Sequence, residues 1–242
     1  MSSAISAPPA LIAHASKDAM AEVLAGEIAA DLSAAIEARG RASFVVSGGS
    51  TPRPLYERLS AAPIDWSKVD IVLMDERWVA PGEAGSNESF VRETLLQGEG
   101  AKARFFGLWS EPGDLAGGRD RAEAALKEVP GPFDVALFGI GTDGHTASWF
   151  PHGQGLAESL APNGRRVEAV SAQASEVTGD LTTRMTLTFP AFTGTRRMIL
   201  LMSSAPKRQA WEAAQGEGPV EDMPVRALLR DPDIDLIAHW AP

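Results

Sequence analysis

An aspartate and a histidine stand one residue apart, directly after a strongly apolar segment. Residues 133–140 have the composition of a buried strand, and the glycine-rich stretch that follows carries Asp143 and His145. Histidine has an unperturbed pKa of about 6.5, so it can accept a proton from water near neutral pH, and a carboxylate can orient its ring. The pair predicts general-base chemistry. A capping aspartate beside a structural histidine would have the same sequence.

A second segment has the residue types of an anion-binding turn. Between an apolar run over 44–46 and a helical pattern that starts at Pro52 stand Gly48, Gly49, Ser50 and Thr51. Glycines let the backbone approach an anion, and hydroxyls and helical N–H groups donate hydrogen bonds to it. A tight strand-to-helix turn capped by the threonine is the structural alternative. The segment lacks the spacing of nucleotide-binding glycine loops, which argues against a nucleotide ligand.

Charged residues supply the remaining candidates. Asp75 to Arg77 follow an apolar run over 69–73, so some of these side chains should enter the crevice that forms where parallel strands end. A solvated charge run is the alternative interpretation. Arg77 is the natural contact for an anion or a carbonyl oxygen. Arg184 and Lys207, each taken alone, have the sequence of ordinary surface charges.

Several kinds of chemistry have no support in the sequence. The chain has no cysteine, which excludes disulfides, thiolate metal sites and a cysteine nucleophile. No HExxH motif or dense acidic loop accompanies the Asp143–His145 pair, so no metal site is predicted. A GxSxG elbow is also missing, so a hydrolase with this sequence would use water as its nucleophile.

The elements that must position these residues alternate along the chain. Predicted strands cover 11–14, 42–47, 69–74, 104–108, 133–140, 166–170, 185–188, 198–202 and 234–240. Predicted helices cover 16–39, 52–60, 86–96, 115–129, 206–215 and 224–229. This alternation predicts an α/β fold: a Rossmann-like, doubly wound, mainly parallel sheet with helices on both faces. We expect one domain over 1–242, in which residues 151–183 could form a small subsidiary lobe or lid.

The first helix has the clearest signals. Its apolar residues recur at spacings of three and four; they are Met20, Val23, Leu24, Ile28, Leu32 and Ile36. Ser16 is the expected N-cap and Gly40 the expected stop. These signals predict an amphipathic helix packed on the sheet.

Composition limits the partners. With 22 basic and 32 acidic residues the net charge is -10, which disfavours binding to a nucleic acid backbone. A hydrophobic content of 44% and a charged content of 22% are ordinary for a globular protein. No run approaches the ~18 apolar residues of a membrane span, and the first nine residues lack the features of a signal peptide. We therefore expect a cytoplasmic protein that binds neither membrane nor nucleic acid.

Taken together, the motifs resemble the 6-phosphogluconolactonase family, within the superfamily that also includes glucosamine-6-phosphate deaminase/isomerase. The matching segments occur in family order and span essentially the whole chain; they are 47–52, 75–78, 86–87, 139–148, 184–188 and Lys207. One departure is Ser203 and Ser204, which stand where the family often has a glycine before the lysine.

The resemblance implies hydrolysis of 6-phospho-D-glucono-1,5-lactone to 6-phospho-D-gluconate, without a metal or organic cofactor, by a monomer or small homo-oligomer. It implies that His145 activates water, that Asp143 orients the imidazole, and that Arg77 lies near the carbonyl or ring oxygens. The implied substrate-binding residues are Gly48, Gly49, Ser50, Thr51, Asp75, Asn87, Arg184 and Lys207. Of these, Gly49, Ser50, Thr51, Arg184 and Lys207 would hold the phosphate.

Two alternatives remain open. A glucosamine-6-phosphate deaminase/isomerase would share the turn, the acidic pair and the histidine, but it would have an aromatic residue where Arg77 stands. It would also have a carboxylate and an asparagine within the segment 146–151, where this chain has neither. A non-catalytic sugar-phosphate sensor would be expected to carry a DNA-binding helix-turn-helix, and the sequence has no segment for one.

Overall fold

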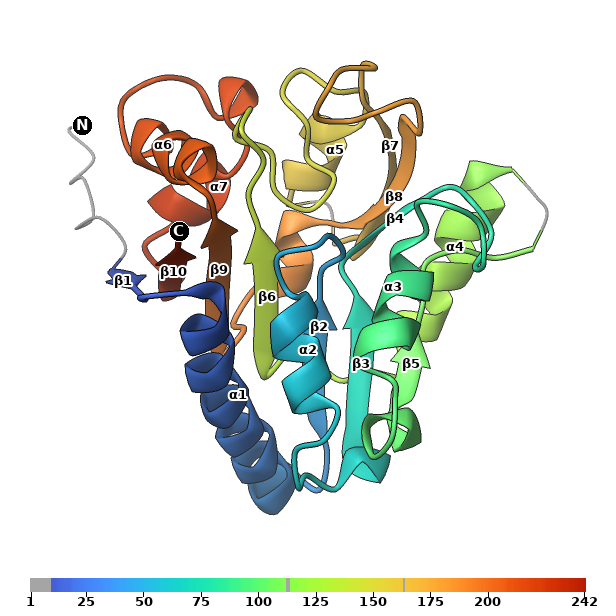
Figure 1. Cartoon of the computed structure of the whole chain (residues 1–242). Coiled ribbons are helices and arrows are strands. Elements are labelled where there is room, and N and C mark those ends of the chain that lie inside the picture. Colours follow the sequence, from blue (N-terminus) through green and yellow to red (C-terminus); the bar gives the residue numbers. More distant parts are fainter. Residues whose placement is uncertain (1–9, 112–113, 163) are drawn as a thin grey trace.

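The computed structural model describes residues 10–111, 114–162 and 164–242 (Figure 1). Its central sheet has seven strands in the order β1-β10-β9-β6-β2-β3-β5, and every pair of neighbours is parallel. These strands are β1 (Leu11–Ala13), β2 (Ala42–Val46), β3 (Val69–Leu73), β5 (Arg104–Phe106), β6 (Val135–Gly139), β9 (Arg197–Ser203) and β10 (Leu236–Ala241). The predicted α/β fold with a mainly parallel sheet is confirmed.

Helices join the strands of the sheet. The α-helices are α1 (Lys17–Arg39), α2 (Arg53–Leu59), α3 (Asn87–Thr94), α4 (Leu115–Leu126), α5 (Leu156–Leu160), α6 (Ala205–Ala214) and α7 (Arg226–Arg230). Short 3-10 helices are η1 (Trp66–Lys68), η2 (Gly100–Lys102), η3 (Phe189–Phe192) and η4 (Val220–Asp222). None of the helices in the described part of the chain combines the length and apolar character that crossing a membrane requires.

Helix α1 begins and ends where its sequence signals predict. The Ser16 hydroxyl accepts a hydrogen bond from the backbone N–H of Ala19 at 3.1 Å, and Gly40 ends the helix at φ 80°. The buried face differs from the predicted one in one position. Val23 is 44% exposed, because the face that packs on the sheet passes through small residues such as Ala21 and Ala25. Alanines at this contact allow the helix backbone to approach the strands closely.

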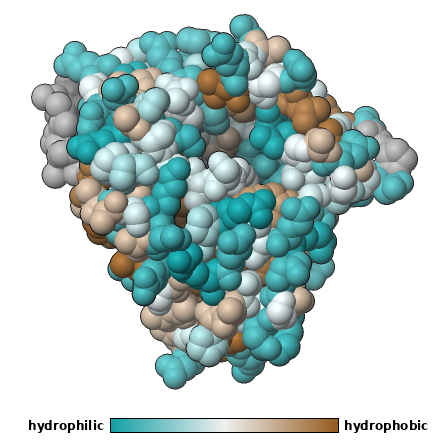
Figure 2. All heavy atoms as spheres, in the orientation of Figure 1, coloured by the Kyte–Doolittle hydropathy of each residue, from teal (hydrophilic) through white to brown (hydrophobic). Residues whose placement is uncertain are grey.

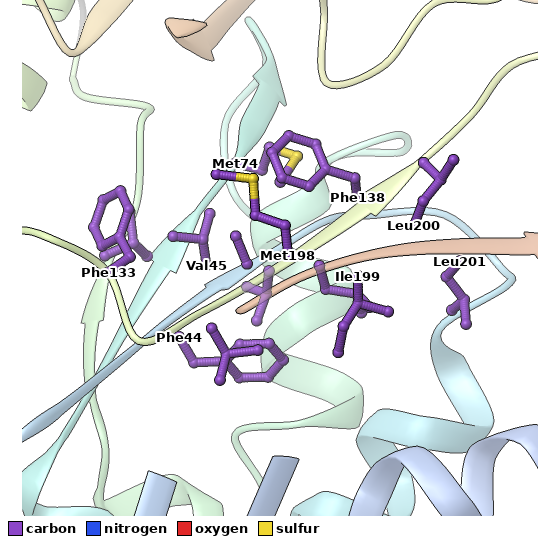
Figure 3. Close-up of a cluster of buried hydrophobic side chains, with 14 of the residues drawn as sticks. Phe44, Val45, Met74, Phe133, Phe138, Met198, Ile199, Leu200 and Leu201 are labelled. Carbon is purple, nitrogen blue, oxygen red and sulfur yellow. The ribbon is translucent and has the colours of Figure 1, made fainter. Parts of the chain in front are cut away.

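The apolar core lies on both faces of the central sheet. In Figure 3, Phe44 of β2 and Phe138 of β6 point away from the sheet on opposite sides. Phe44 packs edge-to-face on Tyr56 of α2, with ring centroids 6.4 Å apart. Phe138 packs on Phe192 of η3, with centroids 4.7 Å apart. All four aromatic side chains are almost completely buried, so the residues that alternate along each strand fill both layers of the core.

A second, smaller sheet stands beside the main one. The sequence predicts two of its three strands, at 166–170 and 185–188, but not that they form a separate sheet. The small sheet has the order β4-β8-β7 and is antiparallel; its strands are β4 (Asp75–Arg77), β7 (Val167–Ser171) and β8 (Thr183–Leu187). The sequence left open whether residues 75–77 are a charged run, and they are a strand. The segment 151–183, for which a lobe or lid was one option, contributes α5 and β7 to this region, beside β4 and β8 (Figure 1).

The order of the central strands creates a topological switch point. From β2 the chain proceeds to β3 and β5 on one side, then returns to β6 on the other side and continues to β9 and β10. Strands β2 and β6 are neighbours in the sheet, and the connections that leave their carboxyl ends therefore run in opposite directions. In open α/β sheets this divergence at the carboxyl ends of the strands is where ligands bind.

Candidate active site

A cavity of about 380 Å³ lies at this switch point, over the carboxyl ends of β2 and β6. The surface drawn in Figure 2, on which hydrophilic side chains predominate, is hollowed in its upper half. The cavity is lined by Ser47, Gly48, Gly49, Asp75, Arg77, Asn87, Gly139, Ile140, Gly141, Thr142, His145, Ala147, Phe150, Glu176, Val177, Arg184 and Lys207. Eight of the predicted site residues are among them, although they come from segments far apart in the sequence.

Asp143 and His145 form the predicted pair. Oδ1 of Asp143 lies 2.6 Å from Nδ1 of His145 and also accepts the backbone N–H of His145 at 3.1 Å. Burial raises the pKa of Asp143, but the hydrogen bond from the imidazole and the charge of His145 outweigh it, so the pKa of this carboxyl is lowered. An ionised Asp143 places the ring proton on Nδ1 and leaves Nε2 as the acceptor.

Gly141 leaves room for the side chains of Asp143 and His145, because it has no side chain of its own. A Cβ atom at position 141 would lie 2.1 Å from Nδ1 of His145 and 2.5 Å from Oδ1 of Asp143, which no side chain could tolerate without displacing them. On its other side the imidazole packs on the ring of Phe150, with centroids 4.6 Å apart. Backbone and aromatic ring together hold the imidazole in one orientation.

Two arginines are brought together by the small antiparallel sheet. Arg77 of β4 and Arg184 of β8 are directly opposite each other in the strand register, and both line the cavity. Arg184 is 4% exposed; burial and the charge of Arg77 lower its pKa to about 10, although Asp75 and Glu76 oppose this. Like charges opposite one another on a sheet are destabilising, so the pair favours an anionic ligand.

The donors of these arginines are only partly used. Arg184 donates to the backbone carbonyls of Leu181 at 2.6 Å and Thr178 at 2.8 Å, and Arg77 donates to the carbonyl of Gly85. Nε of Arg77 is buried without a hydrogen-bond partner among the described residues. A buried donor of this kind is costly unless a ligand satisfies it.

Lys207 adds a third cation from α6. Burial, together with the charge of Lys17, lowers its pKa. Across the residues that the structure describes, none of Arg77, Arg184 and Lys207 is in an ion pair with a carboxylate. The cavity therefore presents three cations outside ion pairs, beside the carboxylates of Asp75 and Glu176 in the same lining.

The glycine turn and Asn87 form another part of the cavity lining. Gly48 allows Asn87 to approach the turn, because a Cβ at position 48 would lie 2.0 Å from the amide oxygen of Asn87. Gly49 adopts φ 90°, a conformation that favours glycine. Asn87 donates to the carbonyl of Asp75 at 2.8 Å, and the Asp75 carboxylate accepts from the Ser148 hydroxyl at 2.6 Å.

The structure places the other predicted residues outside the lining. Among the described residues that face the cavity, Ser50 and Thr51 do not appear, and the Thr51 hydroxyl lies 3.0 Å from the hydroxyl of Ser203. Thr51 is therefore not the N-cap of α2, which begins without a side-chain cap. Asp143 reaches the cavity only through His145. The assignment of Ser50 and Thr51 to the phosphate stays a prediction.

Sequence reasoning missed several residues at this site. Phe150, Glu176 and Val177 line the cavity. Phe150 also lies under the guanidinium of Arg184, with 5.6 Å from Cζ to the ring centroid, so it contacts both the imidazole and a cation. No spacing in the sequence indicates these contacts, because they join loops that only the fold brings together. The described residues include no group of three or more His, Asp or Glu side chains placed to hold a metal ion.

Comparison with known proteins identifies the family. The sequence profile of the glucosamine-6-phosphate isomerases/6-phosphogluconolactonase family matches residues 15–237. This chain belongs to that family. Within the family, the 6-phosphogluconolactonase of Rhizobium meliloti is 39% identical over 224 residues, which cover 93% of this chain and 95% of the relative. The 6-phosphogluconolactonase of Pseudomonas aeruginosa is 40% identical over 219 residues, covering 90% and 89%.

Solved structures share the fold of this chain. The crystal structure of a 6-phosphogluconolactonase from Shewanella baltica matches with a TM-score of 0.93 and 36% identity, covering 99% of this chain and 100% of that chain. A monomeric glucosamine-6-phosphate deaminase matches with a TM-score of 0.77 but only 18% identity, which indicates a common fold and no more.

Proposed function

We propose that this chain hydrolyses 6-phospho-D-glucono-1,5-lactone to 6-phospho-D-gluconate, with His145 as the general base. The observation that carries the proposal is that one cavity holds an aspartate-oriented imidazole together with three cations, none of which is in an ion pair with a carboxylate of the described residues. Relatives 38 to 40% identical over nine-tenths of the chain or more are named 6-phosphogluconolactonase, which supports the same reaction.

The proposed chemistry begins at His145. Its Nε2 accepts a proton from water as the water oxygen bonds to the lactone carbonyl carbon, and Asp143 stabilises the resulting imidazolium. A positioned base of this kind typically contributes ~10²- to 10⁴-fold. The tetrahedral intermediate then loses its ring C–O bond, and the imidazolium returns the proton to the departing ring oxygen. Because water attacks the carbonyl carbon directly, the scheme contains no acyl-enzyme.

The three cations are proposed to have two different roles. Arg77 is proposed to stabilise the negative charge that develops on the carbonyl oxygen; its buried, unpaired Nε supports a role as a donor to the substrate. Arg184, Lys207 and the backbone turn at Gly49 are proposed to bind the phosphate. In this scheme neither a metal ion nor an organic cofactor takes part.

The test is the decay of freshly generated 6-phosphogluconolactone between pH 6.5 and 7.5, with the protein, with His145→Ala, and without protein. We expect the wild-type protein to accelerate the decay. Folded His145→Ala should leave the decay at the rate measured without protein. No acceleration by the well-folded wild-type protein would refute the proposal. The same preparation should then be assayed for glucosamine-6-phosphate deamination and for sugar-phosphate binding without turnover, which are the two alternatives.

The two ends of the site should have separable kinetic effects. His145→Ala should lower kcat by about 100-fold or more, because it removes the base. Arg184→Ala should chiefly raise KM, because it weakens phosphate binding in ground state and transition state alike. Steady-state kinetics of both variants measure this. Equal effects on kcat and KM in both would contradict the assigned roles.

A further inference from the structure

Glu76 is a buried carboxylate that the proposed reaction does not use. It lies between Asp75 and Arg77 in β4, and because side chains alternate along a strand, it points away from the cavity that its two neighbours line. Its side chain is completely buried. Burial of a charged group without partners would be very unfavourable, so its contacts must account for its presence.

The contacts join two elements of the site. Oε1 of Glu76 accepts the backbone N–H of Arg77 at 2.8 Å and that of Asn87 at 2.7 Å. Oε2 accepts the backbone N–H of Glu88 at 2.7 Å and the hydroxyl of Ser86 at 3.1 Å. All four partners are donors, which is the pairing of an ionised carboxylate.

Two of these donors are the first N–H groups of α3, which have no partner within the helix. A negative charge at this end of a helix is also stabilised by the helix dipole. Burial raises the pKa of Glu76 to about 7, whereas the three backbone N–H groups act in the opposite direction.

Arg77 and Asn87, whose backbones Glu76 holds, both place side chains on the cavity. Asn87 in turn holds the carbonyl of Asp75 and contacts the turn at Gly48. We propose that Glu76 is a positioning residue: its carboxylate fixes β4 against the start of α3, so that Arg77 and Asn87 meet the substrate in one geometry. The identity of the substrate in this inference rests on the proposed function. The contacts of Glu76 do not depend on that function.

Glu76→Gln tests it. The variant keeps the size of the side chain but turns one acceptor oxygen into a donor that faces donors. We expect kcat/KM for the lactone to fall about 10- to 100-fold, because small displacements of substrate-positioning groups have effects of this size. Glu88→Gln is the matched control. Glu88 is also buried at the start of α3, but its carboxylate pairs with Arg92 at 2.8 Å, so we expect a change below about threefold.

A double-variant cycle separates positioning from a general loss of stability. If Glu76 acts partly through Asn87, then Glu76→Gln should have an effect at least about threefold smaller in an Asn87→Ala background than in the wild-type protein. The same fold loss in both backgrounds, or an equal loss in Glu88→Gln, would overturn the proposal. Should Glu76→Gln fail to fold, Glu76→Asp takes its place in every comparison, since it keeps the charge but shortens the reach.

Failure of the proposed function can be distinguished from failure of the positioning role of Glu76. If the wild-type protein does not accelerate lactone decay, positioning is measured from amide hydrogen exchange at Arg77, Asn87 and Glu88. Faster exchange at these three amides in Glu76→Gln, with the rest of the sheet unchanged, supports the proposal. Unchanged exchange there would overturn it.

Discussion

Gly141 shows how a single missing side chain shapes the site. A Cβ at this position would collide with both Asp143 and His145. We expect Gly141→Ala to displace the imidazole and to lower kcat for the lactone about 100-fold, because a displacement near 1 Å has consequences of that size. Steady-state kinetics would measure the effect, with circular dichroism to show that the variant is folded.

Gly139 is the matched control for this substitution. It also lines the cavity, at the end of β6, but a Cβ there would have nothing within 4 Å. Gly139→Ala should therefore stay within about threefold of the wild-type kcat. If the two alanine variants were equally impaired, the explanation from space around the imidazole would be wrong.

At the scale of elements, the connection from β9 to α6 carries local strain. Ser204 has φ 90° and ψ 150°, a region in which glycine is strongly preferred, and it forms the turn that precedes Lys207. Its side chain is exposed. We expect Ser204→Gly to raise the free energy of unfolding by about 1 kcal/mol, since relief of strain exceeds the entropic cost of glycine. Denaturant unfolding would measure the difference.

The neighbouring serine serves as the comparison. Ser203 lies within β9, is 8% exposed, and its hydroxyl lies 3.0 Å from that of Thr51. Ser203→Gly should lower the free energy of unfolding by about 1 kcal/mol, through loss of this contact and added flexibility in a strand. A loss of stability in Ser204→Gly as well would show that the turn is not strained.

Local sequence patterns predict some elements of this protein well and miss others. Helix α1 is predicted within one residue at each end, because its cap, periodicity and terminal glycine are all local signals. Local patterns do not predict strand β4, because its three charged residues have no apolar alternation. Its pairing with β8 depends on a segment more than 100 residues away. The exposure of Val23 likewise depends on which side of α1 the sheet meets.

At the scale of the whole molecule, a buried histidine makes stability depend on pH. His239 of β10 is completely buried, and its Nδ1 lies 3.0 Å from Nε2 of His14, which follows β1. Burial, the charge of His14 and that of Arg197 lower the pKa of His239 to about 4, although Glu27 of α1 acts in the opposite direction. The pair lies where the first and last strands of the chain meet.

The sign of the effect follows from proton uptake. An unfolded histidine has a pKa of about 6.5, so between about pH 6.5 and 4 the unfolded chain binds a proton that folded His239 does not. The free energy of unfolding should therefore fall as pH falls through this window, by up to ~1.4 kcal/mol per pH unit from this group. Denaturant unfolding at pH 7.5, 6 and 5 would measure the slope.

The slope should be shallower in His239→Gln, which cannot take up a proton in this range. His152→Gln is the control, because His152 is 64% exposed and pairs with Asp222 at the surface. A slope in His239→Gln that equals the wild-type slope would assign the dependence to other groups.

Local patterns in the sequence predict the order along the chain of the strands in the main sheet and the two loops at the switch point. Apolar runs and helical periods are local, and so are the glycines at 48, 49 and 141, which stand where strands end. That the chain forms one domain over 1–242 stays a prediction. The Asp143–His145 contact could also be anticipated, since two residues one position apart in a tight turn are close in any fold.

Charges far apart in sequence combine through tertiary contacts, which local patterns do not contain. Strand pairing sets Arg77 opposite Arg184, and the β9–α6 connection brings Lys207 to the same cavity, whereas Thr51 turns toward Ser203. Taken alone, Arg184 and Lys207 could not be told from surface charges. The physical reason is that a charge acquires a function through its neighbours and its burial, and both depend on contacts between segments that no local pattern contains.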